Sequence, residues 1–384
     1  MNGPTPRENR SAPHAEIAGA GFAGLTAAVA LSQRGWSVRV HEKGPKLRAF
    51  GAGIVVWQNG LRVLNAIGAY EAAMAGSVTP PFYETRLHNE TVTKHAFEGE
   101  PWRTMTRQHL YNSILEQARL YGVDIVVNSE VIRADPAGAI TLASGETLQA
   151  DLVVGADGVG SKVRDSMGIA LDRRKSRDGI TRLLVPRHKE ELGAGEWDNV
   201  IDFWNLEPRV LRILYVPCSE EQLYIAFMAP QDDPEGSQVP INLDLWSDAF
   251  PFLVPALRSA AKIDGRYDRY ETTVLETWTR GRVALIGDAA HAMTPALAQG
   301  ASCAMMNALS LAVAMEGPGS VEDRLEEWEQ RERPMTDRCQ QRSAELTNSR
   351  NLAKGDWWAS DVLLETARHV PTGAAAELAP APSR

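Results

Sequence analysis

The sequence predicts an α/β fold: a parallel sheet assembled from discontinuous segments, with an antiparallel sheet inserted between them. Short apolar strands at 15–18, 152–154 and 283–286 each lead into a glycine-containing loop. Strands that alternate with such loops and with helices indicate a parallel sheet. Residues from about 176 to 275 instead alternate apolar and polar side chains, which is typical of antiparallel strands with one buried face.

The first strand opens a strand–helix–strand unit. A glycine-rich turn follows the strand at 15–18, and the helix after it closes at Gly35. A second strand at 38–41 then ends at Glu42. This order predicts two neighbouring parallel strands, which is how a Rossmann-like sheet begins.

The remaining periodic segments complete this plan. We expect helices near 61–67, 110–118, 300–314 and 321–347, and short strands near 125–127, 139–142 and 147–149. The domains then divide into a parallel-sheet domain (14–79, 106–175 and 276–345), an inserted substrate domain (80–105 and 176–275) and a C-terminal helical segment (346–370). We expect the terminal stretches 1–13 and 371–384 to be disordered.

The composition limits the partners. A net charge of -9 argues against nucleic acid, which requires a basic surface, and gives no support for docking on anionic lipid. No run of 18 apolar residues is present, so no membrane-spanning helix is expected. The three cysteines form no CxxC pair, so we expect no metal site, and a cytoplasmic location fits. The expected partner is a small molecule, and the oligomeric state is not indicated.

The glycine-rich turn matches the pattern G-x-G-x-x-G at Gly19, Gly21 and Gly24. The first glycine permits a tight turn, the second lets a pyrophosphate approach the backbone, and the third lets helix and strand pack closely. The N-terminus of the following helix attracts phosphate through its unpaired N–H groups. Glu42, at the end of the next strand, is placed to accept hydrogen bonds from ribose hydroxyls. Together these features predict dinucleotide binding.

Two further loops place an aspartate after an apolar strand. Asp157 follows the strand at 152–154, and Asp288 follows the strand at 283–286. Ligands of α/β sheets bind at the carboxyl ends of the strands, so both side chains are candidate ligand contacts. The alternative for each is a turn aspartate that caps a helix.

These three loops, at 19–24, 155–158 and 287–288, resemble the fingerprints of flavoprotein aromatic hydroxylases of the para-hydroxybenzoate hydroxylase type. The resemblance implies FAD as cofactor, NADH or NADPH docking transiently as the hydride source, and O₂ as oxidant. For Arg48 and Arg107, the alternative to FAD binding is a solvated surface charge. The implied FAD-binding residues are Gly19, Gly21, Phe22, Ala23, Gly24, Glu42, Lys43, Arg48, Ala49, Arg107, Val131, Asp157, Asp288, Pro295, Ala298, Gln299, Gly300 and Ala301.

A narrower group within that family, the oxygenases of 3-hydroxypyridine carboxylates, is similar to this chain along nearly its whole length. The likeness is carried by the stretches 47–54, 195–199, 212–215 and 295–301. Most members of the wider family have Glu-Asp where this chain has Met306 and Asn307, and the narrower group also lacks that acidic pair. The resemblance therefore implies oxygenation and opening of a pyridine ring, as in vitamin B6 breakdown. The residues by themselves, without the resemblance, predict only that an aromatic ring is hydroxylated.

A carboxylate substrate needs a positive anchor. Arg212 lies on a predicted strand of the inserted sheet, and its planar donors suit a carboxylate. Tyr224, on the next strand, and Tyr83 offer hydroxyls to the ring. The resemblance implies that these three side chains line the substrate pocket. The alternative is that Arg212 forms a structural ion pair and that the tyrosines fill the core.

Other interpretations stay open. His291 follows the Asp288 loop, where a histidine more often supports the loop than acts as a base, so we assign no general base.

The closest alternative function is hydroxylation of a benzenoid acid, such as a salicylate, without ring opening. An alternative of another class is an FAD-binding reductase or a non-catalytic FAD-binding protein.

Overall fold

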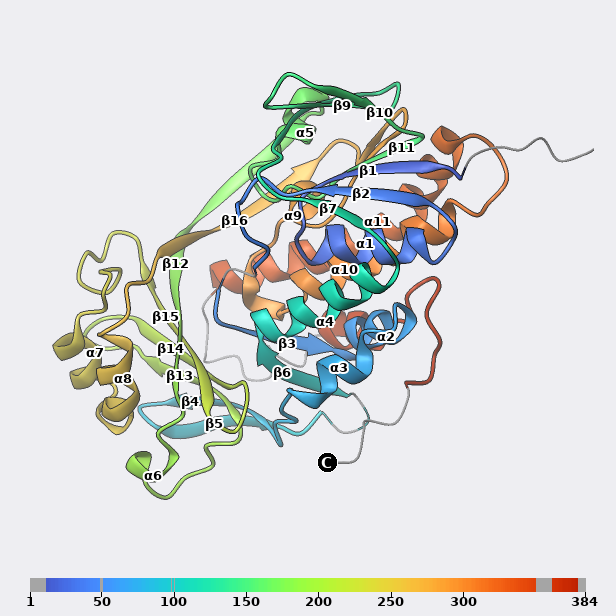
Figure 1. The fold of residues 1–384 in the computed structure, drawn as a ribbon. Helices are drawn as coiled ribbons and strands as arrows, with labels where there is room; N and C mark the ends of the chain where they lie inside the picture. The colour runs from blue at the N-terminus through green and yellow to red at the C-terminus, as the bar shows by residue number, and fades with distance from the viewer. Residues whose placement is uncertain (1–11, 49–50, 98, 100, 350–360, 379–384) are drawn as a thin grey trace, which may run out of the picture.

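The structure is a computed structural model, and it describes residues 12–48, 51–97, 99, 101–349 and 361–378. Within these residues the chain forms a six-stranded and a seven-stranded sheet, with two smaller sheets beside them. Figure 1 shows the six-stranded sheet and the long helices forming one body, from which the seven-stranded sheet extends. The predicted α/β fold is confirmed.

The six-stranded sheet has the order β17-β18-β11-β1-β2-β7, and all of its pairings are parallel except β17–β18. Because β1 pairs with both β2 and β11, and β11 pairs with β18, the loops that follow these strands meet at one edge of the sheet. The strands are β1 (His14–Ala18), β2 (Ser37–His41), β7 (Asp124–Val126), β11 (Leu152–Gly155), β17 (Thr279–Arg280) and β18 (Val283–Leu285).

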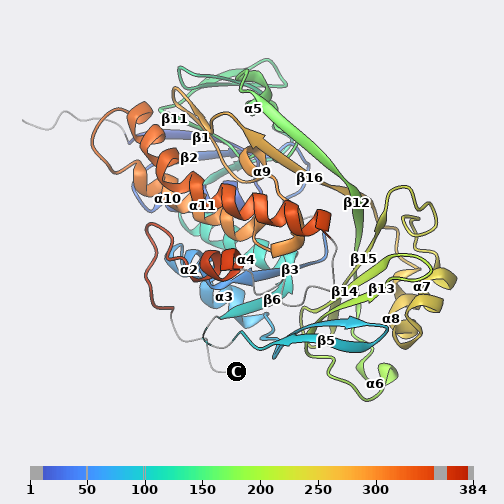
Figure 2. The same ribbon diagram turned by 180° about the vertical axis from the view of Figure 1, so that it is seen from behind.

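Long helices stack beneath this sheet (Figure 2). α1 (Phe22–Ser32) packs against α10 (Gly300–Ala314) and α4 (Arg107–Leu120), and α11 (Val321–Ser349) packs on α10. Alanine, valine and leucine make α1 apolar on all sides, and every residue from 22 to 31 is buried, because α1 lies between the sheet and α10. The predicted helices at 300–314 and 321–347 are confirmed.

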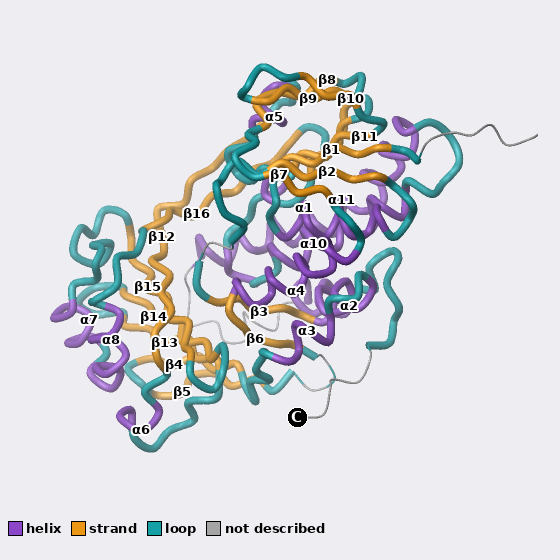
Figure 3. The backbone as a smooth tube through the Cα atoms, in the orientation of Figure 1, coloured by secondary structure: helices purple, strands orange, loops and turns teal. Residues whose placement is uncertain are grey.

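The seven-stranded sheet has the order β16-β12-β15-β14-β13-β4-β5. α7 (Leu243–Ala249) and α8 (Val254–Ala260) cover its outer face, and the inner face turns toward the parallel-sheet domain (Figure 3). The strands are β4 (Tyr83–Leu87), β5 (Glu90–His95), β12 (Leu171–Pro186), β13 (Val200–Asn205), β14 (Leu211–Pro217), β15 (Gln222–Pro230) and β16 (Tyr267–Leu275).

The inserted sheet departs from the prediction in two respects. β13 and β4 pair in parallel, because β4 comes from a distant segment and no hairpin ties it to β13. Of the segment 80–105, only β4 and β5 join this sheet, and β6 (Trp102–Thr106) pairs instead with β3 (Gly53–Trp57). β12 and β16 pair with each other and run between the two bodies (Figure 1).

The C-terminal residues differ from the expectation of disorder as far as the structure describes them. Residues 371–378 pack on the core, with Ala374 and Leu378 against the main apolar cluster. The short elements not yet named are α2 (Gln58–Ala66), α3 (Tyr70–Ala75), α5 (Lys162–Ser166), α6 (Lys189–Leu192), α9 (Asp288–His291), α12 (Asp361–Arg368), β8 (Val131–Asp135), β9 (Ala139–Leu142), β10 (Thr147–Gln149), and the 3₁₀ turns η1 (Pro251–Leu253) and η2 (Pro295–Leu297).

Candidate active site

The glycine turn between β1 and α1 is shaped as the sequence predicts. Gly19 has φ +99°, and a Cβ there would lie 2.4 Å from the Ala156 carbonyl oxygen. A Cβ on Gly24 would lie 1.9 Å from the Gly19 carbonyl oxygen. A Cβ on Gly21 would instead meet nothing within 4 Å. The turn therefore packs tightly on the protein side and leaves open space above the N-terminus of α1, as a bound pyrophosphate requires.

Glu42 lies beside this turn. Its carboxylate accepts hydrogen bonds from the backbone N–H of Ala20 (3.2 Å) and Gly44 (2.8 Å). These bonds hold the carboxylate next to the glycine turn, where ribose hydroxyls of a dinucleotide can reach it. Lys43 is exposed beside it, and the buried Val131 opens the neighbouring strand β8.

Arg107 begins α4 and reaches the same turn. Its guanidinium lies 4.9 Å over the ring of Phe22, the first residue of α1. Its Nε is buried and has no hydrogen-bond partner among the described residues. Burial and the neighbouring Arg182 lower the pKa of Arg107 below its ordinary value. A guanidinium whose Nε has no partner at this place fits an anionic ligand such as the diphosphate of FAD.

Asp288 comes to the glycine turn from the third loop. Gly287 has φ +60°, and a Cβ on it would lie 2.9 Å from the Cβ of Ala23. Burial raises the pKa of Asp288, while Arg107 and Arg182 act in the opposite direction. The third sequence motif and the first therefore converge on one place, as the sequence predicted.

Asp157 has a different environment. Its carboxylate accepts hydrogen bonds from the backbone N–H of Lys162 (2.8 Å) and Val163 (3.2 Å), and from the hydroxyl of Ser161 (2.5 Å). These contacts cap α5, which is the alternative the sequence left open for this residue. Direct contact between Asp157 and FAD stays a prediction.

The segment from 295 to 301 forms the approach to α10. Ala298 adopts φ +51°, and Gln299 accepts a hydrogen bond from Asn59 Nδ2 at 3.0 Å. Gln299 Nε2 and Ser302 Oγ are buried with no partner among the described residues, which leaves polar groups for a ligand at the N-terminus of this long helix. Arg48 is exposed, and Ala49 lies outside the described residues. FAD contacts of Pro295, Gly300 and Ala301, in the same segment, stay predictions.

The inner face of the seven-stranded sheet meets Gly53, the first residue of strand β3. A Cβ on Gly53 would lie 2.5 Å from the Cβ of Tyr224 and 2.6 Å from the Sγ of Cys218. Tyr224 and Tyr83 are both buried on this face. The two tyrosines and Arg212 therefore share one face, as predicted.

Arg212 is not a lone cation. Its Nε and Nη2 donate to the two carboxylate oxygens of Asp202 at 2.5 and 2.9 Å, and its guanidinium lies 4.8 Å over the ring of Trp204. The ion pair that the sequence analysis kept as the alternative is therefore present. Arg212 nevertheless lies on the inner face, and its side chain is 18% exposed.

Three inner-face residues were missed from the sequence: Arg182, Asp202 and Tyr270. Arg182 lies opposite Ala226 in the sheet, beside the inner-face residue Tyr224, and a Cβ on Gly51 would lie 3.8 Å from its Cδ. Its ion pair with Asp268 is long, at 3.5 Å. The alternation of side chains along β12 could have placed Arg182 on the inner face. The neighbours of Asp202 and Tyr270 could not be predicted in this way, because they depend on the order of the strands.

His291 supports its loop and is not placed as a base. It is buried, Asn307 Nδ2 donates to its Nε2 at 3.1 Å, and burial lowers its pKa to about 4. Asn307 also donates to Thr336. His291 is therefore neutral near pH 7. In the described part of the chain, no cluster of three or more His, Cys, Asp or Glu side chains could hold a metal ion.

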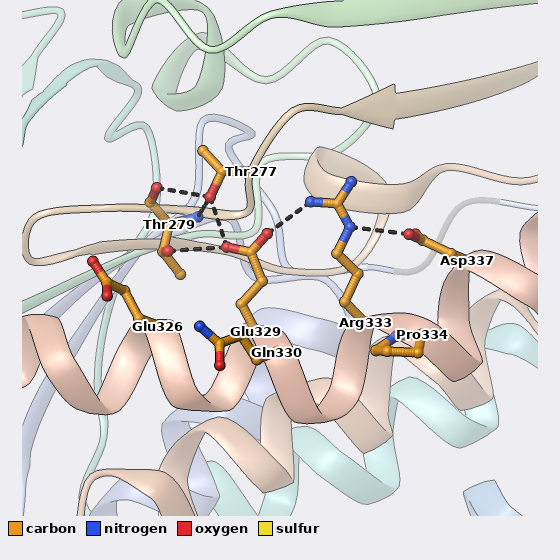
Figure 4. A pocket seen from close by; sticks show the side chains of 8 residues that line it. All are labelled: Thr277, Thr279, Glu326, Glu329, Gln330, Arg333, Pro334 and Asp337. Atoms are coloured by element: carbon orange, nitrogen blue, oxygen red, sulfur yellow. Dashed lines mark hydrogen bonds and ion pairs between the residues drawn. The ribbon is translucent and has the colours of Figure 1, made fainter.

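A separate pocket of about 610 Å³ lies between α11 and the strand region around β17 (Figure 4). Glu329 accepts hydrogen bonds there from Thr277 (2.7 Å), Thr279 (3.0 Å) and Arg333 (2.7 Å). Arg333 also donates to Asp337 at 3.0 Å. These hydrogen bonds join α11 to the sheet. Because the polar groups already bind one another, they offer little to a ligand.

The fold agrees with that of known proteins. The family model described as "FAD binding domain" matches residues 14–343. The chain belongs to this family. A 2-heptyl-3-hydroxy-4(1H)-quinolone synthase from Mycobacteroides abscessus is 38% identical over 337 residues, which cover 86% of this chain and 88% of the relative. A 6-hydroxynicotinate 3-monooxygenase from Pseudomonas fluorescens is 27% identical and covers 80% of this chain and 84% of its own.

Among solved structures, the tetrameric form of 2-methyl-3-hydroxypyridine-5-carboxylic acid oxygenase is 58% identical to this chain. The two superpose with a TM-score of 0.93 over 95% of this chain and 99% of the other. The protein is therefore an FAD-dependent aromatic monooxygenase, of a class that typically uses NAD(P)H and O₂. No helix in the described ranges is long and apolar enough to cross a membrane.

Proposed function

We propose that this enzyme oxygenates a 3-hydroxypyridine carboxylate, of the 2-methyl-3-hydroxypyridine-5-carboxylate or 5-hydroxynicotinate type, and opens its ring. The observation that carries the proposal is the inner face itself, where two arginines, Arg182 and Arg212, stand among Tyr83, Tyr224 and Tyr270. Arginine suits a carboxylate, and tyrosine suits the hydroxyl and nitrogen of a pyridine. The 58% identity to the pyridine oxygenase spans this sheet as well.

The residues at the junction of the two sheets would divide the work. Arg107, Glu42 and the N-termini of α1 and α10 would hold FAD, which when bound accepts hydride and delivers oxygen to the ring. Arg182 and Arg212 would orient the substrate carboxylate, and Tyr83 and Tyr224 would orient the ring. Burial raises the pKa of Tyr83 and Tyr224, so both hydroxyls stay protonated at pH 7 and can donate hydrogen bonds.

The other candidates fit this face less well. The quinolone synthase, by its name, makes a product with a heptyl chain, and its identity to this chain is lower, at 38%. A long alkyl chain would gain nothing from two inner-face arginines. A benzenoid acid such as salicylate would satisfy the arginines equally, so the nature of the product separates that candidate from a pyridine acid.

The experiment uses the purified, FAD-loaded enzyme. We expect 5-hydroxynicotinate and 2-methyl-3-hydroxypyridine-5-carboxylate to stimulate NADH or NADPH oxidation and to give acyclic products that carry an atom from labelled O₂. Salicylate and 2-heptyl-4-quinolone serve as comparisons. An intact hydroxylated ring as the product would refute ring opening. Stimulation by the comparison compounds alone would refute the pyridine substrate.

A further inference from the structure

Asp202 is a buried carboxylate on the inner face that no sequence motif pointed to. It lies on β13, its exposure is 0%, and both of its oxygens accept hydrogen bonds from Arg212 on β14. Burial raises the pKa of Asp202, and Arg212 opposes that shift. Burial of Arg212 acts to lower its pKa, but the facing carboxylate holds it above its ordinary value. Two hydrogen bonds from one guanidinium favour the charged form of this carboxylate, so the contact is an ion pair.

The contacts of Arg212 determine which of its guanidinium nitrogens stays available on the inner face. Asp202 engages the Nε and Nη2 edge, and Trp204 lies against the flat face of the guanidinium at 4.8 Å. Tyr83 lies within electrostatic reach of both Asp202 and Arg212. The guanidinium is thus held on one edge and one face, and this leaves its Nη1 as the group that Asp202 does not engage.

The same contact sets the charge of the inner face. Asp202 pairs closely with Arg212, at 2.5 Å, whereas the ion pair of Arg182 with Asp268 is longer, at 3.5 Å, and partly exposed. Of these two arginines, Arg182 is therefore the more loosely paired cation on the inner face. A loosely paired guanidinium can still bind a substrate carboxylate.

We infer that Asp202 is a positioning and specificity residue: it orients Arg212 and Tyr83 toward the substrate ring and matches the inner face to a substrate with a single carboxylate. The inference rests on the proposed function. A purely structural role for the pair, joining β13 to β14, would affect every ligand alike.

The same sheet offers a matched control. Glu84 on β4 is also 0% exposed, and both of its oxygens accept from Arg86 at 2.9 Å. Arg86 lies 5.6 Å over Phe203, which belongs to the outer-face cluster, so the pair of Glu84 and Arg86 lies on the outer face of the sheet. Asp202→Asn and Glu84→Gln therefore each remove one buried charge from an arginine pair, on opposite faces.

The test measures binding of 5-hydroxynicotinate and of its uncharged analogue 5-hydroxynicotinamide to each FAD-loaded variant. In Asp202→Asn we expect the preference for the acid over the amide to rise about fivefold or more, because the charge of Arg212 is freed. We also expect more hydrogen peroxide per NAD(P)H oxidised, because the ring is held less firmly. Glu84→Gln should keep the wild-type preference and coupling.

Equal changes for acid and amide in Asp202→Asn, or the same change in Glu84→Gln, would overturn the inference. If Asp202→Asn fails to fold, Asp202→Glu decides instead: it keeps the charge and moves the guanidinium, so coupling should fall while the preference stays. Unchanged coupling in that variant would overturn the inference too. If the wild type binds neither ligand, the proposed function fails first, and this inference falls with it.

Discussion

Buried polar side chains at the junction of the two sheets find their partners in distant parts of the chain. Asn307, on α10, donates to the ring of His291, and Asp202 holds Arg212 across two strands. Asn307 stands where the sequence departs from the acidic pair of the wider family. An amide donor there suits a neutral imidazole, because Nε2 must accept and therefore carries no proton.

His291 should make the protein less stable in mild acid. Its folded pKa, about 4, lies below the ordinary value of 6.5, so the unfolded chain binds more protons between these two values. Its contribution is complete above pH 6.5 and is lost as the pH falls toward 4, by on the order of 3 kcal/mol. Denaturant unfolding of wild type and His291→Asn from pH 7.5 to 4.5 measures this. Parallel pH curves for the two proteins would contradict it.

Strand β3 and the turn before it join the two halves of the site. Gly51 lies against the side chains of Arg107 and Arg182, and Gly53 lies against Tyr224 and Cys218. Glycine at these positions lets the strand approach the inner face more closely than any other residue would allow. The spacing between the cofactor groups and the substrate tyrosines is therefore set by this one element.

Gly53→Ala should disturb that spacing. The added methyl would lie 2.5 Å from Tyr224 and 2.6 Å from Cys218, so the strand or the tyrosine must move. We expect a loss of about 1–3 kcal/mol in unfolding free energy and weaker binding of the aromatic acid, with FAD retained. Thermal unfolding, flavin content and acid titration test this. An unchanged affinity for the acid would show that Tyr224 does not contact it.

At the scale of the whole molecule, the C-terminal residues 368–378 pack against the helices of the parallel-sheet domain. Arg62 on α2 is buried, and it donates to the carbonyl oxygens of Arg368, His369 and Ala376. Gly373 packs against α10, where a Cβ would lie 2.5 Å from Val313. The segment thereby links α2, which follows β3, to the long helices.

Arg62→Ala should release this segment, because three of its carbonyl groups would lose their donor. We expect a loss of about 2–4 kcal/mol in unfolding free energy and faster proteolysis within 369–378. Arg34→Ala is the control: Arg34 pairs with the exposed Glu316 and does not reach the segment, so its loss should cost about 1 kcal/mol or less. Equal proteolysis of both variants would contradict the proposed link.

The sequence by itself determined the nucleotide half of the site. The glycine turn, Glu42 and the loop at Asp288 follow from local patterns, since a strand end, a tight turn and a helix start are encoded by adjacent residues. Arg107 was implied by the family resemblance. In the substrate half the resemblance implied Arg212, Tyr83 and Tyr224, and the tertiary structure alone added Asp202, Arg182 and Tyr270. Whether Asp202 meets Arg212, and whether Arg182 and Tyr270 share their face, depends on strand order and register. Those are set by contacts between residues far apart in the chain, which no local pattern records.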